Sequence, residues 1–243
     1  MTTFIQAVLK ANEEIALALK EGFIPSWFEK TQVGAGGDVS SRLDLMAEAI
    51  FVKHLGSFGQ IESEESGIMG TGEQRIIIDP IDGSSNALSL FPYYGTSVAK
   101  IDASGVLDDA MVCNLANGDI FFTQASKGVQ QGKLFADTFH APYSVAHPEV
   151  GLFEKAYANP RLVALLDKAE LKFRAPGAIA LSLAYAHCVS YVLFMGKFRI
   201  YDFAAGLALC EGLEVIVEED YVIVSKDKRI AEKIEALITQ LQD

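Results

Sequence analysis

Cysteine and basic residues are both scarce in this sequence. The three cysteines, Cys113, Cys188 and Cys210, are an odd number and lie far apart in apolar surroundings. This pattern argues against a disulfide framework or a zinc site and favours buried, reduced thiols. Lys and Arg total 20 against 32 Asp and Glu, so the formal net charge is −12. Because no run of basic residues interrupts this acidity, binding to nucleic acid or to an anionic membrane surface is disfavoured.

A secretory leader pattern is also missing, because Lys10, Glu13 and Glu14 interrupt any apolar core near the N-terminus. We therefore expect a cytoplasmic protein. Residues 175–196 carry no charged side chain and are long enough to cross a bilayer. Small and polar residues dilute this stretch, and its second half turns β-branched and aromatic. We therefore expect a buried helix followed by a buried strand there, and no membrane span.

Hydrophobic periodicity divides the chain into helices and strands. Helices are predicted at 3–20, 43–55, 160–170, 178–187, 203–211 and 227–241. Strands are predicted at 75–79, 96–101, 110–115, 120–123, 191–194, 214–217 and 221–224. The Gly-rich stretch 33–37 is predicted to be a mobile loop or hairpin turn, and short turns between the strands from 96 to 123 predict antiparallel pairing. The pattern indicates an α/β protein of two packed subdomains, 1–130 with most candidate metal ligands and 131–243.

The segment 79–86 carries the clearest chemical signal. It follows an isoleucine strand and places Asp79 and Asp82 three residues apart, with the Ile81 carbonyl between them. Hard divalent cations such as Mg²⁺ prefer such oxygen ligands. The backbone N–H groups of Gly83, Ser84 and Ser85 come next and would suit a phosphate at a helix N-terminus. An Asp-Gly pair alone is typical of an ordinary turn. The whole combination favours metal-assisted phosphate chemistry.

Four motifs of this sequence resemble those of one family and occur in the same order along the chain. Residues 79–86, Asp-Pro-Ile-Asp-Gly-Ser-Ser-Asn, match throughout the metal motif of the inositol monophosphatase and fructose-1,6-bisphosphatase superfamily. Residues 63–66, Ser-Glu-Glu-Ser, resemble its Glu-Glu-[Ser/Thr] element, and the series from Asp38 to Asp44 resembles its Asp-x-x-[Ser/Thr]-x-x-Asp element. Residues 201–206, Tyr-Asp-Phe-Ala-Ala-Gly, are similar to its second metal signature.

The resemblance implies a function, a cofactor and a fold. The chain would be a phosphoric monoester hydrolase with an αβαβα five-layer sandwich, usually oligomeric and most simply a homodimer. It would use two or three Mg²⁺ ions, with Mn²⁺ as a substitute. The implied metal ligands are Glu64, Asp79, Ile81, Asp82 and Asp202.

The same resemblance assigns the catalytic and phosphate-binding groups. Asp44 would orient the hydroxyl of Ser84, and Ser84 with Glu64 would activate the attacking water. The phosphate would be bound by Gly83, Ser84, Ser85 and Asn86.

Each motif also has a purely structural interpretation. A Glu-Glu pair is usually solvated. Asp38, Ser40 and Ser41 could simply cap the helix that follows them, and Asp202 could be the N-cap of an Ala-rich helix. For Asp202 both interpretations can hold together, because an acidic cap also suits the helix dipole.

Substrate choice depends on residues outside the metal motif. Many inositol phosphatases place a glutamate before Met-Gly, whereas this sequence reads Phe194-Met195-Gly196. This departure counts against a dedicated inositol site and agrees with an enzyme that accepts fructose 1,6-bisphosphate, inositol 1-phosphate or both. The candidate sugar or second-phosphate contacts are Arg174, Gly177, Lys197 and Arg199, although exposure is the default for Lys and Arg. The alternatives are a nucleotide 3′-phosphatase and a non-catalytic phosphate- or magnesium-binding regulatory module.

Overall fold

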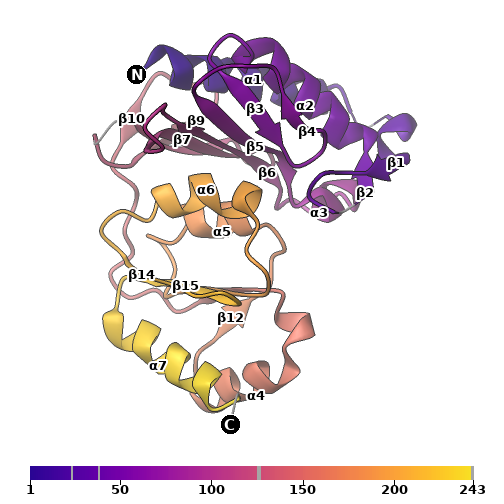
Figure 1. Ribbon diagram of the computed structural model, residues 1–243. Coiled ribbons are helices and arrows are strands. Elements are labelled where there is room, and N and C mark those ends of the chain that lie inside the picture. The colour runs from indigo at the N-terminus through magenta and orange to yellow at the C-terminus, as the bar shows by residue number, and fades with distance from the viewer. Residues whose placement is uncertain (23, 38, 125–126, 242–243) are drawn as a thin grey trace.

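Helical and sheet layers alternate through the computed structural model, which describes residues 1–22, 24–37, 39–124 and 127–241 (Figure 1). Pairs of helices form the two outer layers and the middle layer, and a sheet lies in each space between them. From the first layer to the last, the helices are α1 (Thr3–Lys20) with α2 (Arg42–Leu55), α5 (Ile179–Ala184) with α6 (Ile200–Ala208), and α4 (Pro160–Lys168) with α7 (Lys228–Thr239). The αβαβα sandwich implied by the sequence resemblance is therefore confirmed.

The first sheet has eight strands in the order β10-β9-β8-β7-β6-β5-β3-β4. Its strands are β3 (Gln60–Ser63), β4 (Gly67–Met69), β5 (Arg75–Asp82), β6 (Gly95–Ile101), β7 (Leu107–Asn114), β8 (Asp119–Gln124), β9 (Gln130–Lys133) and β10 (Phe139–His140). All neighbours run antiparallel except β3 and β5, which run parallel. The parallel pair matters for function, because its carboxyl ends meet at one edge of the sheet.

The second sheet has five strands in the order β12-β11-β13-β15-β14. They are β11 (Gly151–Glu154), β12 (Phe173–Arg174), β13 (Val192–Met195), β14 (Glu214–Val217) and β15 (Tyr221–Ser225). The remaining elements are the antiparallel hairpin of β1 (Lys30–Val33) and β2 (Val39–Ser41), the one-turn helix α3 (Ser84–Leu88), and the 3-10 turns η1 (Pro25–Phe28) and η2 (Ala156–Ala158).

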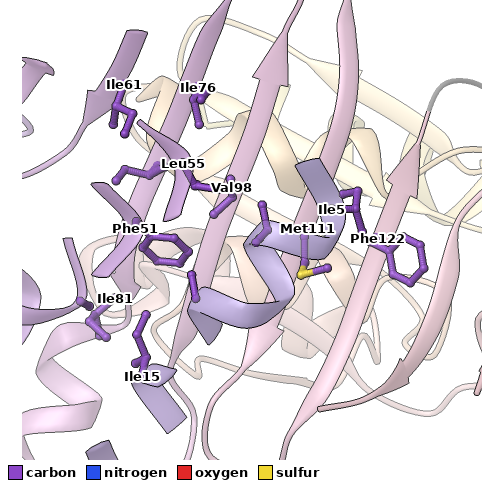
Figure 2. Close-up of a cluster of buried hydrophobic side chains, with 14 of the residues drawn as sticks. Ile5, Ile15, Phe51, Leu55, Ile61, Ile76, Ile81, Val98, Met111 and Phe122 are labelled. Carbon is purple, nitrogen blue, oxygen red and sulfur yellow. The ribbon is translucent and has the colours of Figure 1, made fainter. Parts of the chain in front are cut away.

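Apolar side chains fill each space between layers. Because successive strand residues face opposite ways, β5 directs Ile76 and Ile78 toward α1 and α2 but Ile77 toward α5 and α6. Figure 2 shows the first of these clusters, in which Phe51 and Leu55 of α2 lie beside the strands that carry Ile76 and Val98. Two more clusters fill the spaces on either face of the second sheet. This burial holds β5 rigidly on both faces, directly before its acidic end.

Most predicted elements are confirmed, and two details change. The Gly-rich stretch 33–37 does join a hairpin, and the strands from 95 to 124 are antiparallel. However, α6 begins at Ile200 with Arg199 as N-cap, so Asp202 lies in its first turn and is not the cap as the structural interpretation supposed. Cys113 and Cys210 are buried free thiols, whereas Cys188 is only partly buried.

The uncharged stretch 175–196 contributes the short helix α5 and the strand β13. Within the described part of the chain, every helix is too short or too polar to cross a bilayer. Strands β9 and β10 extend the first sheet as far as His140. The division into subdomains at residue 130 stays a prediction.

Candidate active site

Three carboxylates from three different elements meet at the end of the parallel strand pair. Glu64 follows β3, and its N–H donates to the Ile78 carbonyl of β5 at 3.1 Å, which brings it beside Asp79. Asp202 approaches from the first turn of α6 in the layer below. Oxygen atoms of Glu64, Asp79 and Asp202 all lie within 4.8 Å of one another, and all three residues are buried. The sequence motifs that supply them are therefore one site in space.

Like charge and burial act together on the two aspartates of the motif. Asp79 and Asp82 are each only 3% exposed. Burial, and then repulsion from Glu64 and other nearby carboxylates, holds the pKa of Asp79 well above its usual range. The pKa of Asp82 is also raised well above that range by burial, although the Leu181 N–H, which donates to Asp82 Oδ2 at 2.8 Å, acts in the opposite direction. Ionisation of this cluster is therefore unfavourable unless a cation compensates the charge.

The donor set fits a hard divalent cation. The clustered ligands are carboxylate oxygens, as Mg²⁺ and Mn²⁺ prefer, and neither histidine nor cysteine joins the cluster within the described residues. Glu64, Asp79 and Asp202 would hold such an ion. The Ile81 carbonyl and Asp82 lie along the same cavity wall as candidates for a further ion.

Asp44 and Ser84 form the pair that the sequence predicted. Ser84 Oγ lies 2.8 Å from Asp44 Oδ1 and 2.9 Å from the Ile81 carbonyl, so its one proton has two acceptors. The other oxygen of Asp44, Oδ2, accepts from the Ser41 N–H and Oγ, each at 2.7 Å. Ser41 is the N-cap of α2 and forms a capping box with Asp44. Ser41 therefore caps the helix, as the structural interpretation supposed, and Asp44 contacts Ser84, as the resemblance implied; the catalytic role of the pair stays a prediction. Asp38 lies outside the described residues.

The residues after Asp82 divide between cavity wall and scaffold. Gly83, Ser84 and Ser85 line the cavity. Gly83 has a φ of 87° and could not carry a side chain, since a Cβ would lie 3.0 Å from that of Ala178. Asn86 instead points away from the cavity and donates from Nδ2 to the carbonyls of Tyr93 and Pro176, both at 2.7 Å. In this structure Asn86 holds the neighbouring loop.

The predicted basic contacts differ in their placement. Arg199 reaches into the carboxylate cluster, where Nε lies 2.7 Å from Asp202 Oδ2 and Nη1 lies 2.9 Å from Glu64 Oε1. Lys197 is exposed, and Arg174 is exposed with Nη1 donating to the Phe173 carbonyl at 2.8 Å. Neither Lys197 nor Arg174 lines the described cavity.

The cavity above the cluster has a volume of about 570 Å³ and includes residues that the sequence analysis missed. Glu154, Lys155 and Tyr157 line it from the end of β11 and the turn that follows. Glu154 pairs in register with Phe194 of β13, so a carboxylate does stand beside the position where the sequence lacks one. A short apolar run that ends in an acid, as at Asp79, was the available signal for Glu154.

Comparison with known proteins identifies this arrangement. Residues 1–219 match the model of the inositol monophosphatase family. The chain belongs to the inositol monophosphatase family. It is therefore a phosphatase of a Mg²⁺-dependent family whose substrates are small phosphate esters, and the acidic cluster is able to bind such an ion.

Relatives within the family carry several names. The chain is 30% identical over 221 residues to a fructose-1,6-bisphosphatase/inositol-1-monophosphatase from Methanothermobacter thermautotrophicus, covering 82% of this chain and 75% of that protein. It is 24% identical over 237 residues to a bifunctional NADP phosphatase/NAD kinase from Methanococcus maripaludis, covering 86% of this chain but only 42% of that protein. A crystal structure of the extragenic suppressor protein SuhB from Bartonella henselae superposes with a TM-score of 0.76 at 23% identity, covering 97% and 96% of the two chains.

The raised pKa values of the aspartates predict a pH-dependent stability of the metal-free enzyme. The folded state binds protons on Asp79 and Asp82 more tightly than the unfolded state does. Their contribution is therefore complete below the ordinary aspartate pKa and is lost as the pH rises through the raised values. In EDTA, the thermal unfolding temperature should decrease as the pH is raised from about 5 to about 8. Asp79→Asn, which cannot titrate, should show a shallower fall, and an equal slope in both proteins would contradict the assignment.

The position of Arg199 predicts competition with a divalent cation. Its guanidinium pairs with Glu64 and Asp202, two of the three carboxylates that would hold a metal ion. Arg199→Gln should therefore lower the thermal midpoint of the metal-free protein and tighten Mg²⁺ binding roughly threefold to tenfold in calorimetric titration. Arg161→Gln, an exposed change on α4, is the matched control. Weaker Mg²⁺ binding in Arg199→Gln would show that the arginine supports the site instead.

Proposed function

We propose that this phosphatase hydrolyses a small sugar or polyol phosphate, with fructose 1,6-bisphosphate, inositol 1-phosphate or both as substrates. The observation that carries the proposal is the contact between Ser84 and Asp44 directly beside the cluster of Glu64, Asp79 and Asp202. A hydroxyl backed by a carboxylate, next to a site for divalent cations, suits the activation of water for attack on phosphorus.

Each group has a definite task in this proposal. Two or three Mg²⁺ ions, for which Mn²⁺ can substitute, supply charge neutralisation for the phosphoryl oxygens when bound. Glu64 and Ser84 would orient the attacking water, and Ser84 Oγ would accept the proton of that water while it passes its own proton to Asp44 Oδ1. Gly83 and Ser85 line the cavity, and their backbone N–H groups would donate to the phosphoryl oxygens.

The proposed substrate class also agrees with the cavity. Behind the metal site the wall changes to Lys155, Tyr157 and Phe194, and Lys155 Nζ lies 5.0 Å from the centre of the Phe194 ring. A mixed cationic and aromatic wall suits a polyol or sugar with a second anionic group. The archaeal relative named for both phosphatase activities supports the same choice. We further propose a cytoplasmic homodimer, on the family resemblance and the acidic chain without disulfides.

Two other functions follow from the relatives. The similarity to an NADP phosphatase favours a nucleotide phosphate as second candidate, and this candidate is close to the nucleotide 3′-phosphatase alternative raised by the sequence. A relative in Escherichia coli, 29% identical over 235 residues, is named Nus factor SuhB. This similarity is the basis for a regulatory role as the other candidate. A nucleotide phosphatase would use the same Ser84–Asp44 pair, whereas a regulatory module would not need it, so the presence of the pair favours catalysis.

The deciding experiment is phosphate release from a substrate panel with Mg²⁺ and with EDTA. The panel contains fructose 1,6-bisphosphate, inositol 1-phosphate, glycerol phosphates, adenosine 3′,5′-bisphosphate and NADP. We expect the highest kcat/KM with one of the first two. Asp79→Asn should lower kcat by more than about 100-fold while the protein remains folded, because a ligand loses its charge but keeps its shape.

Asp137→Asn, an exposed change far from the motifs, is the control for this experiment. Absence of Mg²⁺-dependent release from every compound would refute the enzymatic proposal. A preference for NADP or adenosine 3′,5′-bisphosphate would replace the substrate class but retain the reaction.

Arg199 offers a separate test of the substrate class. Its guanidinium lines the cavity and would pair with a second phosphate once divalent cations take its place on the carboxylates. At saturating Mg²⁺, Arg199→Ala should raise KM about tenfold for a bisphosphate and much less for a monophosphate. Equal increases in KM for the two substrates would remove Arg199 from substrate recognition.

A further inference from the structure

Glu154 is a buried carboxylate that the family motifs leave without a role. It ends β11, is only 3% exposed, and lines the cavity opposite the motif strand. Its oxygens accept three hydrogen bonds: from the Gly177 N–H at 2.9 Å, from the Ala178 N–H at 3.4 Å and from Ser182 Oγ at 2.5 Å. A single side chain of the second sheet thus holds the loop that leads into α5 and the first turns of that helix.

The loop that Glu154 holds is joined to the metal motif at three points. The Pro176 carbonyl accepts from Asn86 Nδ2, and the Ala178 side chain fills the space against which Gly83 packs. Next along α5, the Leu181 N–H donates to Asp82 Oδ2 at 2.8 Å. Among the hydrogen bonds found in the described chain, this last one fixes the orientation of the Asp82 carboxylate.

Burial of the Glu154 carboxylate is opposed by its desolvation and by nearby negative charge. Burial raises its pKa, and repulsion from Asp202 acts in the same direction, while its three hydrogen bonds oppose both. A buried carboxylate is commonly no more stabilising than an apolar side chain of similar size. Its neighbour across the sheet, Phe194, shows that an apolar residue is accommodated at this level. Stability therefore does not explain why this position carries a charge.

We propose that Glu154 is a positioning residue for Asp82. It fixes residues 177–182 against the second sheet, and through the Leu181 N–H it sets the direction in which Asp82 presents its free oxygen. This inference rests on the proposed function, in which Asp82 is a metal ligand. It extends the site from the first sheet across the middle helical layer to the second sheet. Partners that orient metal ligands typically contribute 10-fold to 100-fold to metal affinity or activity.

Two substitutions separate positioning from simple charge. Glu154→Gln keeps the length of the side chain but has one carbonyl oxygen, so it cannot accept from both the Gly177 N–H and the Ala178 N–H. Glu154→Asp keeps the negative charge near Asp82, yet it is one methylene too short to reach the same three donors. If Glu154 acts by positioning, both variants bind Mg²⁺ more weakly than wild type. If it acts only by adding negative charge near the metal site, Glu154→Asp keeps the wild-type behaviour.

The experiment is calorimetric titration of the full chain with MgCl₂ in the absence of substrate, with thermal unfolding in EDTA as a check on folding. We expect both variants to bind Mg²⁺ about tenfold more weakly than wild type. Ser182→Ala, which removes one donor but leaves the carboxylate in place, should have a smaller effect in the same direction. Glu149→Gln, an exposed change just before β11, is the matched control.

Kinetic measurements give a second readout that a general loss of stability would not produce. In both Glu154 variants the Mg²⁺ concentration for half-maximal rate should rise about tenfold, whereas KM for substrate at saturating Mg²⁺ should stay within about twofold of wild type. Should Glu154→Asp unfold, Ser182→Ala with the same split in parameters carries the test.

The outcomes distinguish this inference from the proposed function. If wild-type protein binds Mg²⁺ and both Glu154 variants bind it as tightly as wild type, the positioning role is overturned. The proposed function is then unaffected. Wild-type affinity in Glu154→Asp with weak binding in Glu154→Gln also overturns it, in favour of a charge effect. Wild-type protein that fails to bind Mg²⁺ at all overturns the proposed function, and the inference with it.

Discussion

Mutual repulsion among buried carboxylates is the constraint to which the rest of this structure responds. Asp79 and Asp82 are almost completely buried, and Glu64 and Asp202 add further negative charge within a few ångströms. Such a group of charges opposes folding unless donors and cations surround it. The Leu181 N–H supplies one donor and Arg199 supplies an internal cation. The remaining demand for positive charge is what makes the site suitable for divalent metal ions.

The layered architecture meets the cost of this arrangement elsewhere. Four apolar clusters fill the spaces between the five layers, and β5 contributes isoleucines to two of them just before its acidic end. The strand is therefore held by packing on both faces where it is apolar, and it presents mutually repelling carboxylates where it ends. In β5, the isoleucines of the apolar core are followed directly by the aspartates of the site.

The sequence revealed the parts of the site that lie close together along the chain. Asp79, Asp82 and Ser84 fall within one motif, and the structure brings Asp44 and Glu64 to them as the resemblance implied. Short antiparallel connections were also predictable, because tight turns permit no other pairing. Features that depend on contacts between distant segments could not be predicted from the sequence. The register of β11 against β13, which brings Glu154 beside Phe194, cannot be deduced from either strand alone.

Local patterns also misjudged which side chains face the cavity. Arg199 is the N-cap of α6 and turns back onto the carboxylates, while Lys197 of the same basic pair remains in solvent. Lys197 and Arg199 are only two residues apart, but only Arg199, at the start of α6, contacts Asp202 in the first turn of that helix. Asn86, within the most recognisable motif, serves the loop behind the cavity. Sequence motifs thus identified the chemistry better than they identified the direction of each side chain.

The distribution of the ligands among layers has a consequence for how the protein is made. All strands of the first sheet are synthesised by His140, with Glu64, Asp79 and Asp82 already in place, but Asp202 and the Leu181 N–H emerge from the ribosome much later. Until those segments exist, the middle layer cannot cover the acidic end of β5, and like charges that face water repel one another only weakly. Full burial of these charges needs α5 and α6, so the packing of the middle helical layer, and not the formation of the sheet, creates the demand for a cation.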